Sequence, residues 1–222
     1  MVSLQNVVDT DYKGIVHWAI DTDQEVLKRI HEEDVNIAIY ERDTSKLKSE
    51  INSLLDQNIE FRASGDIDAI MSDVVKVVDQ HTHSLIIKDM ERLLSYFQEV
   101  VQTTNCRLLL AAINSNMCRK FHTDINEIRM LCTYSGPGTL WLTDDNINRR
   151  ALGARGREDE RIAIEESKVQ QVKTGAVTLL KGALYPYDRA NAVVHRSPTI
   201  EESGEKRLLL RVDNNDTSRL WA

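Results

Sequence analysis

Cysteine, proline and glycine are scarce in this chain of 222 residues, which contains 3, 3 and 9 of them respectively. Cys106, Cys118 and Cys132 are widely spaced and form no C-x-x-C pair, so a zinc knuckle or dithiol redox chemistry is not indicated. We expect buried, reduced thiols, which fit a reducing compartment.

No apolar run approaches the roughly 20 residues that a membrane helix needs, and residues 1–14 do not have the pattern of a secretory signal. The chain is therefore expected to be cytoplasmic.

The common motifs for nucleotide binding and hydrolysis are also missing. There is no G-x-x-x-x-G-K-[ST], G-x-G-x-x-G, G-x-S-x-G or H-E-x-x-H. The 28 Lys and Arg residues against 35 Asp and Glu residues give a net charge of -7, which disfavours nucleic acid and anionic membranes as partners. Hydrophobic residues at 41% are typical of a globular protein. We expect a small-molecule or peptide substrate, no nucleic-acid partner and no membrane partner.

The turn-forming residues are unevenly distributed, and this divides the chain into two parts. Only Gly14 and Gly65 precede residue 130, and all three prolines follow it. Residues 1–105 can therefore sustain helices, whereas residues 106–222 are expected to be rich in short strands. No linker separates the two parts, so they could also form one compact domain.

Hydrophobic periodicity predicts the individual elements. A capping box at Thr22-Asp23-Gln24-Glu25 begins a helix that should reach residue 33. The other helices are expected near residues 47–55, 66–79 and 85–101, and a short β-prone run covers 35–40. Seven strands, typical of a sandwich or barrel, are expected at 108–113, 128–134, 139–142, 169–173, 177–181, 192–195 and 207–212.

A group of candidate metal ligands lies in the β-rich part. His122 and Asp124 alternate in sequence, so on an extended backbone both side chains point to one face. His195 ends a later apolar strand and supplies a third ligand. Arg207 and Arg211 share one face of the last strand, where a guanidinium can form a paired contact with a carboxylate.

The order His122-x-Asp124, His195 and Arg207 resembles the iron(II) and 2-oxoglutarate-dependent oxygenases. The resemblance implies an α+β protein whose double-stranded β-helix, a cupin-like jelly roll, carries a helical N-terminal region. It also implies that the two histidines and the aspartate are catalytic and bind Fe(II), and that Arg207 binds the distal carboxylate of 2-oxoglutarate, with Arg211 in reserve. If the strand after Asp124 continues without a bulge, Tyr134 faces inward and donates a hydrogen bond to the cosubstrate.

A second resemblance covers most of the chain. The segments around residues 118–124, 129–139 and 195–198 resemble a bacterial family of uncharacterised domains, which implies no activity. Two alternatives to the oxygenase stay open. One is a cupin-like metal enzyme that uses iron, manganese or zinc without 2-oxoglutarate. The other is a non-catalytic protein of metal binding or metal homeostasis, in which Cys118 or Cys132 could complete a closed zinc site.

Overall fold

A seven-stranded sheet organises the fold of this protein. The computed structural model describes residues 16–152, 162–185 and 192–214. All neighbouring strands of the large sheet are antiparallel except the first pair, β1 and β2, which is parallel. The order across the sheet is β1 (Trp18–Asp21), β2 (Ile37–Tyr40), β8 (Val177–Lys181), β5 (Ile128–Ser135), β10 (Arg207–Asn214), β4 (Cys106–Ile113) and β3 (Glu60–Gly65).

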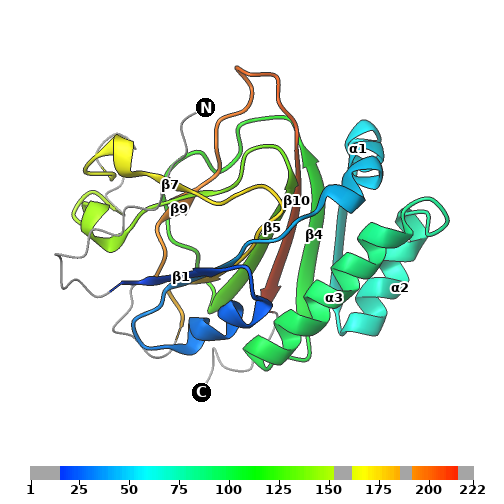
Figure 1. Cartoon of the computed structure of the whole chain (residues 1–222), viewed down its shortest axis with the longest axis horizontal. Helices are drawn as coiled ribbons and strands as arrows, with labels where there is room; N and C mark the ends of the chain where they lie inside the picture. Colours follow the sequence, from blue (N-terminus) through cyan, green and yellow to red (C-terminus); the bar gives the residue numbers. More distant parts are fainter. Residues whose placement is uncertain (1–15, 153–161, 186–191, 215–222) are drawn as a thin grey trace.

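Helices cover one face of this sheet. Figure 1 shows α2 and α3 on one side of β4, β5 and β10, with β7 and β9 on the other side. The largest hydrophobic cluster lies between the helices and the sheet, and joins residues of α3 such as Phe97 to Leu208 and Leu210 of β10. The helices are η1 (Gln24–His31, a 3-10 helix), α1 (Lys48–Asp56), α2 (Ile67–Val77) and α3 (Ser84–Val101), with short 3-10 turns at Ser45–Leu47, Asp144–Asn146 and Glu166–Lys168.

A second, three-stranded sheet packs on the opposite face. Its order is β7 (Gln170–Gln171), β6 (Leu140–Trp141) and β9 (His195–Arg196). Trp141 of this sheet shares a hydrophobic cluster with Leu131 and Leu209 of the large sheet. The two sheets therefore enclose an apolar layer between them, separate from the layer beneath the helices.

The strands agree well with the sequence pattern, with local differences. The expected helix over residues 22–33 is a 3-10 helix, which the side chain of Asp23 caps by accepting a hydrogen bond of 3.0 Å from the amide of Glu25. Residues 192–194, expected to be a strand, precede β9 instead of belonging to it. Strands β1 and β3 were not expected. No helix in the described part of the chain is long and apolar enough to span a bilayer.

Strands from residues 1–105 and from residues 106–222 share the large sheet. β1 and β2 extend the sheet beyond β8 at one end, and β3 extends it beyond β4 at the other end. The helical part of the chain thus supplies both outer edges of the sheet.

Candidate metal centre

Three side chains that are far apart in sequence converge beside the large sheet. His122, Asp124 and His195 each offer one ligand atom, and these atoms all lie within 4.8 Å of one another. The Nε2 atom of His195 is 3.4 Å from Oδ2 of Asp124, and Nε2 of His122 is 3.7 Å from Oδ1 of the same carboxylate. The structure therefore brings together the His-x-Asp…His triad expected from the sequence.

Alternation along two short segments directs both histidine rings to the triad. Phe121 and Val194 belong to a small hydrophobic cluster on the outer side of the second sheet. Because alternate residues of an extended chain face opposite sides, His122 and His195 point inward. The main chains of the two histidines exchange two hydrogen bonds of 3.0 Å, which fixes the separation of the rings.

The main chain also orients each imidazole ring. The Nδ1 atom of His122 lies 2.8 Å from the carbonyl oxygen of Lys120, and Nδ1 of His195 lies 3.2 Å from that of Val193. A carbonyl oxygen only accepts, so Nδ1 is the donor in both rings. When the rings are neutral, each Nε2 therefore presents its lone pair toward the triad, as in metal-binding histidines.

His195 is held in its neutral form. Burial lowers the pKa of its imidazole to about 4, because the charged form loses its hydration, although Asp124 acts in the opposite direction. A metal can therefore bind near neutral pH without first displacing a proton from this ring.

The carboxylate of Asp124 also fits a cation. Its Oδ1 atom forms an ion pair with Nη1 of Arg129 at 2.5 Å. Its Oδ2 atom is buried and accepts no hydrogen bond from the described residues. A buried carboxylate oxygen without a donor is unfavourable unless a cation compensates for it. Two histidines and one carboxylate on one side of an ion are the ligand set of non-haem iron(II) oxygenases, in which other positions stay open.

Behind Asp124, an ion-pair network that the sequence did not reveal fixes Arg129. Asp213 accepts from Nε of Arg129 at 2.6 Å and from the side-chain amide of Asn126 at 3.1 Å. Arg129 and Asp213 are cross-strand neighbours on β5 and β10. In the sequence each of the two residues is only a polar residue in a predicted or neighbouring strand segment, as many others are, so the sequence could not identify this pair.

Arg207 is a buried cation on the face between the two sheets. Its exposed fraction is 1%, and its Nη2 atom donates to Oγ1 of Thr133 at 3.2 Å. Among the described residues no carboxylate lies within ion-pair distance of it, and its Nε atom has no hydrogen-bond partner. Burial lowers the pKa of this guanidinium to about 10. A buried charge that lacks a counter-ion destabilises the protein, so this position is suited to an anionic ligand.

Arg211 has a different environment from Arg207, although both lie on the same face of β10. It is half-buried, and its Nε atom is 3.2 Å from Oδ2 of Asp213. Arg211 is thus already paired with a carboxylate that also holds Arg129.

Tyr134 lies on the opposite face of the sheet, so the expectation that it faces inward with Asp124 is wrong. Residues 125–127 bend between Asp124 and β5, and the bend reverses which alternate residues face the second sheet. Tyr134 belongs to the hydrophobic cluster beneath the helices, and its hydroxyl donates to Oδ2 of Asp89 at 2.8 Å. The structure does not bring this phenol to the triad.

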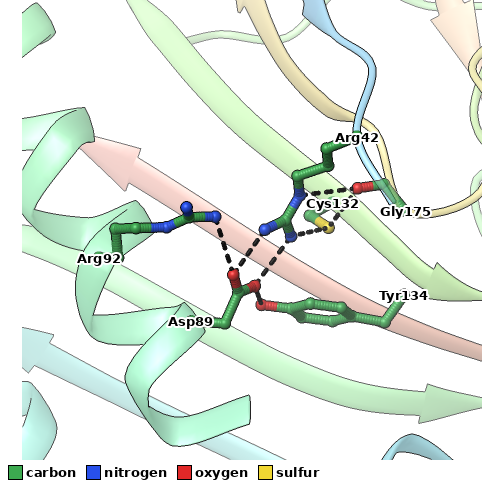
Figure 2. Close-up of polar contacts among 6 residues, drawn as sticks. All are labelled: Arg42, Asp89, Arg92, Cys132, Tyr134 and Gly175. Carbon is green, nitrogen blue, oxygen red and sulfur yellow. Dashed lines mark hydrogen bonds and ion pairs between the residues drawn. The ribbon is translucent and has the colours of Figure 1, made fainter. Parts of the chain in front are cut away.

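The partner of Tyr134 belongs to a buried polar cluster that fixes α3 to the sheet. In Figure 2 both oxygens of Asp89 meet the guanidinium of Arg42, and Arg92 reaches the same carboxylate. Arg42 also donates to the carbonyl of Gly175 and to Sγ of Cys132. Cys132 therefore lies on the helix side with Tyr134. The group of possible metal ligands contains no cysteine in the part of the chain that the structure describes.

Fold and site together define a class: a mixed α+β protein with two sheets and a group of two histidines and one carboxylate that could hold a metal ion. Residues 21–213 match the family described as "Protein of unknown function (DUF1826)", and the chain belongs to that family. No curated protein matches the chain.

Two solved plant structures show the similarity of fold. The 2-oxoglutarate complex of a dioxygenase for auxin oxidation from Arabidopsis thaliana superposes with a TM-score of 0.56 at 7% identity, over 90% of this chain and 92% of that one. The rice dioxygenase for auxin oxidation gives a TM-score of 0.51 at 11% identity, over 90% and 82% of the two chains. At such low identity the comparison concerns the fold alone.

Proposed function

We propose that this protein is a non-haem iron(II) and 2-oxoglutarate-dependent oxygenase of the hydroxylase type, whose two sheets form a double-stranded β-helix. The observation that carries the proposal is the convergence of His122, Asp124 and His195, with ligand atoms within 4.8 Å of one another. The buried, unpaired guanidinium of Arg207 favours a carboxylate cosubstrate over a metal enzyme that uses none.

The protein's own residues have distinct tasks in this function. With iron(II) and 2-oxoglutarate bound, the chemistry supplied would be oxidation of a C–H bond by O₂, in which one oxygen atom enters the substrate and the other enters succinate, while 2-oxoglutarate loses CO₂. His122 and His195 would hold the ion through neutral Nε2 atoms, and Asp124 would contribute the negative charge. Arg207 would bind the distal carboxylate of 2-oxoglutarate. The apolar layer between the sheets excludes water from the same region.

An anaerobic titration tests the proposal. Adding 2-oxoglutarate to the iron(II)-loaded protein should produce a weak visible charge-transfer band, because the keto acid chelates the metal. His122→Ala should abolish the band by removing a metal ligand. His81→Ala is the matched control, since His81 is exposed and is not part of the triad. Tight metal binding without any band would instead support the cupin-like enzyme or the metal-homeostasis protein.

Variants of the two arginines identify the cosubstrate site. Arg207→Met should retain the metal and lower the affinity for 2-oxoglutarate by about 10-fold to 100-fold, because hydrogen bonds to charged groups contribute about 1.5–3 kcal/mol. Arg211→Met should have a smaller effect, since Asp213 already occupies that guanidinium. The reverse result would assign the carboxylate to Arg211.

A further inference from the structure

A group of arginines lies on the face of the large sheet that carries the metal triad. Cross-strand register places Ser64, Arg107, Asp213 and Arg129 side by side on β3, β4, β10 and β5. The next row, two residues along each strand, contains Arg62 and Arg211, with Leu109 between them. Cross-strand neighbours share a face, so all four arginines project to the same side.

These side chains line a pocket of about 580 Å³. We call it the arginine pocket, and define it by Arg62, Arg107, Arg129 and Arg211, with Asp73 and Asp213 also in its wall. Its volume lies in the range that holds small-molecule ligands.

The arginine pocket adjoins the metal centre through one shared side chain. Arg129 lines the pocket, and its Nη1 atom contacts Oδ1 of Asp124. A molecule in the pocket would therefore lie against the group that holds the metal-ligand carboxylate.

The local charge has the opposite sign to that of the whole chain. The chain carries a net charge of -7, whereas four arginines and two aspartates line the pocket. Asp213 is shared between Arg129 and Arg211, Asp124 also pairs with Arg129, and Asp73 forms an ion pair with Lys76 outside this set. Arg62 pairs with Glu60, and Arg107 has no ion-pair partner among the residues described by the structure. The carboxylates present thus leave positive charge in the pocket.

We propose that the arginine pocket binds an anionic group, phosphate or carboxylate, of the substrate that is oxidised at the adjacent metal centre. This inference rests on the function proposed above and adds the substrate class to it. A guanidinium presents its N–H donors in a planar fork that matches both oxyanions, and Arg107 presents such a fork with no carboxylate paired to it among the described residues.

The pocket is distinct from the site assigned to the cosubstrate. Arg207 does not line it. Along β10, Arg207 is four residues from Arg211, the nearest pocket residue of that strand, or about 13 Å of extended strand. The two sites therefore offer separate positions for 2-oxoglutarate and for an anionic substrate.

Calorimetric titration of the full chain at low ionic strength tests this inference, with inorganic phosphate and malonate as separate probes and no metal added. At least one probe should bind saturably. Arg107→Gln should lower its affinity about 5-fold to 10-fold, and Arg62→Gln with Arg107→Gln should lower it further. Arg29→Gln, which changes an exposed arginine on η1, should leave it unchanged. Preference for phosphate or for malonate indicates which oxyanion the substrate carries.

Three results would overturn the inference. They are the absence of saturable binding by both probes, equal affinity in the wild type and the Arg62/Arg107 variant, and loss of binding in Arg207→Met instead. In a parallel titration with Mn²⁺, binding that appears only when the metal is added would be a fourth such result, because it would assign the anion to the metal. Because no turnover or charge-transfer band enters this assay, its failure is distinguishable from failure of the oxygenase proposal.

Discussion

The main chains of His122 and His195 are paired by two reciprocal hydrogen bonds, although the two residues are 73 positions apart in sequence. Their rings follow this pairing and lie 4.6 Å apart between centroids. The spacing of the two imidazole ligands is thus set by backbone hydrogen bonding. Backbone pairing of this kind restricts where the two imidazole rings can lie.

The burial of His195 predicts a pH dependence for the stability of the metal-free protein. The folded-state pKa of His195 is lowered to about 4 from 6.5, so the unfolded chain binds the proton more readily. Its contribution to stability is full above about pH 6.5 and is lost as the pH falls toward 4. At about 1.4 kcal/mol per unit, the loss is on the order of 3 kcal/mol. Urea unfolding at pH 7, 6 and 5 should show this fall in the free energy of unfolding. In His195→Asn the free energy of unfolding should depend less on pH, and the same pH dependence in both proteins would contradict the role given to His195.

Because the charge of Arg207 is buried and unpaired, we predict that this residue lowers the free energy of unfolding of the protein without cosubstrate, although it raises the affinity for 2-oxoglutarate. Replacing Arg207 by Met and its hydrogen-bond partner Thr133 by Val should stabilise the protein without cosubstrate by about 1–4 kcal/mol, because an apolar pair replaces a buried charge. The same double variant should lose affinity for 2-oxoglutarate. Denaturant unfolding measures the first effect. If the double variant is less stable than the wild type, then the cost of burying the guanidinium charge is already offset by interactions in solution.

Tyr134 is predicted to contribute to stability alone. Tyr134→Phe removes the hydrogen bond to Asp89 but leaves the two bonds from Arg42 to that carboxylate in place. We expect a loss of about 1–2 kcal/mol in the free energy of unfolding. Affinities for metal and 2-oxoglutarate should not change. A loss of affinity for 2-oxoglutarate without a loss of affinity for the metal would contradict this prediction and would show that Tyr134 contributes to cosubstrate binding.

Gly136 is predicted to position Arg207. It has a φ of +79°, and a Cβ atom there would lie 2.4 Å from the carbonyl oxygen of Lys206 and 2.8 Å from Cγ of Arg207. Gly136→Ala should cost more than 1 kcal/mol and lower the affinity for 2-oxoglutarate more than that for the metal. Gly204→Ala is the matched control, since Gly204 has a φ of +66° but no atom near its Cβ position. Equal effects of both variants on cosubstrate affinity would contradict the positioning role.

The sequence predicted the ligand group because its chemistry is local. His122 and Asp124 are two residues apart on extended backbone, and His195 ends an apolar run, so residue type and period made them candidates; their joint role as metal ligands came from the resemblance to the oxygenases. The face of Tyr134 was not predictable in the same way. It depends on the bend at residues 125–127, where no proline or glycine marks a turn.

Features that depend on long-range pairing were also missed. Strand β3 alternates exposed and half-buried residues and contains Glu60, Ser64 and Gly65, none of which favours a strand. It becomes a strand because β4 supplies its hydrogen-bond partners. Arg129 and Asp213 likewise matter through the pairing of β5 with β10, which makes neighbours of these two residues although they are 84 positions apart.

The placement of β1, β2 and β3 at the two ends of the large sheet limits how residues 106–222 can be transferred to another protein. A chain reduced to residues 106–222 would expose the open backbone edges of β4 and β8, which invites intermolecular strand pairing. The half that carries the metal ligands is therefore expected to aggregate when it is fused to another protein without these strands.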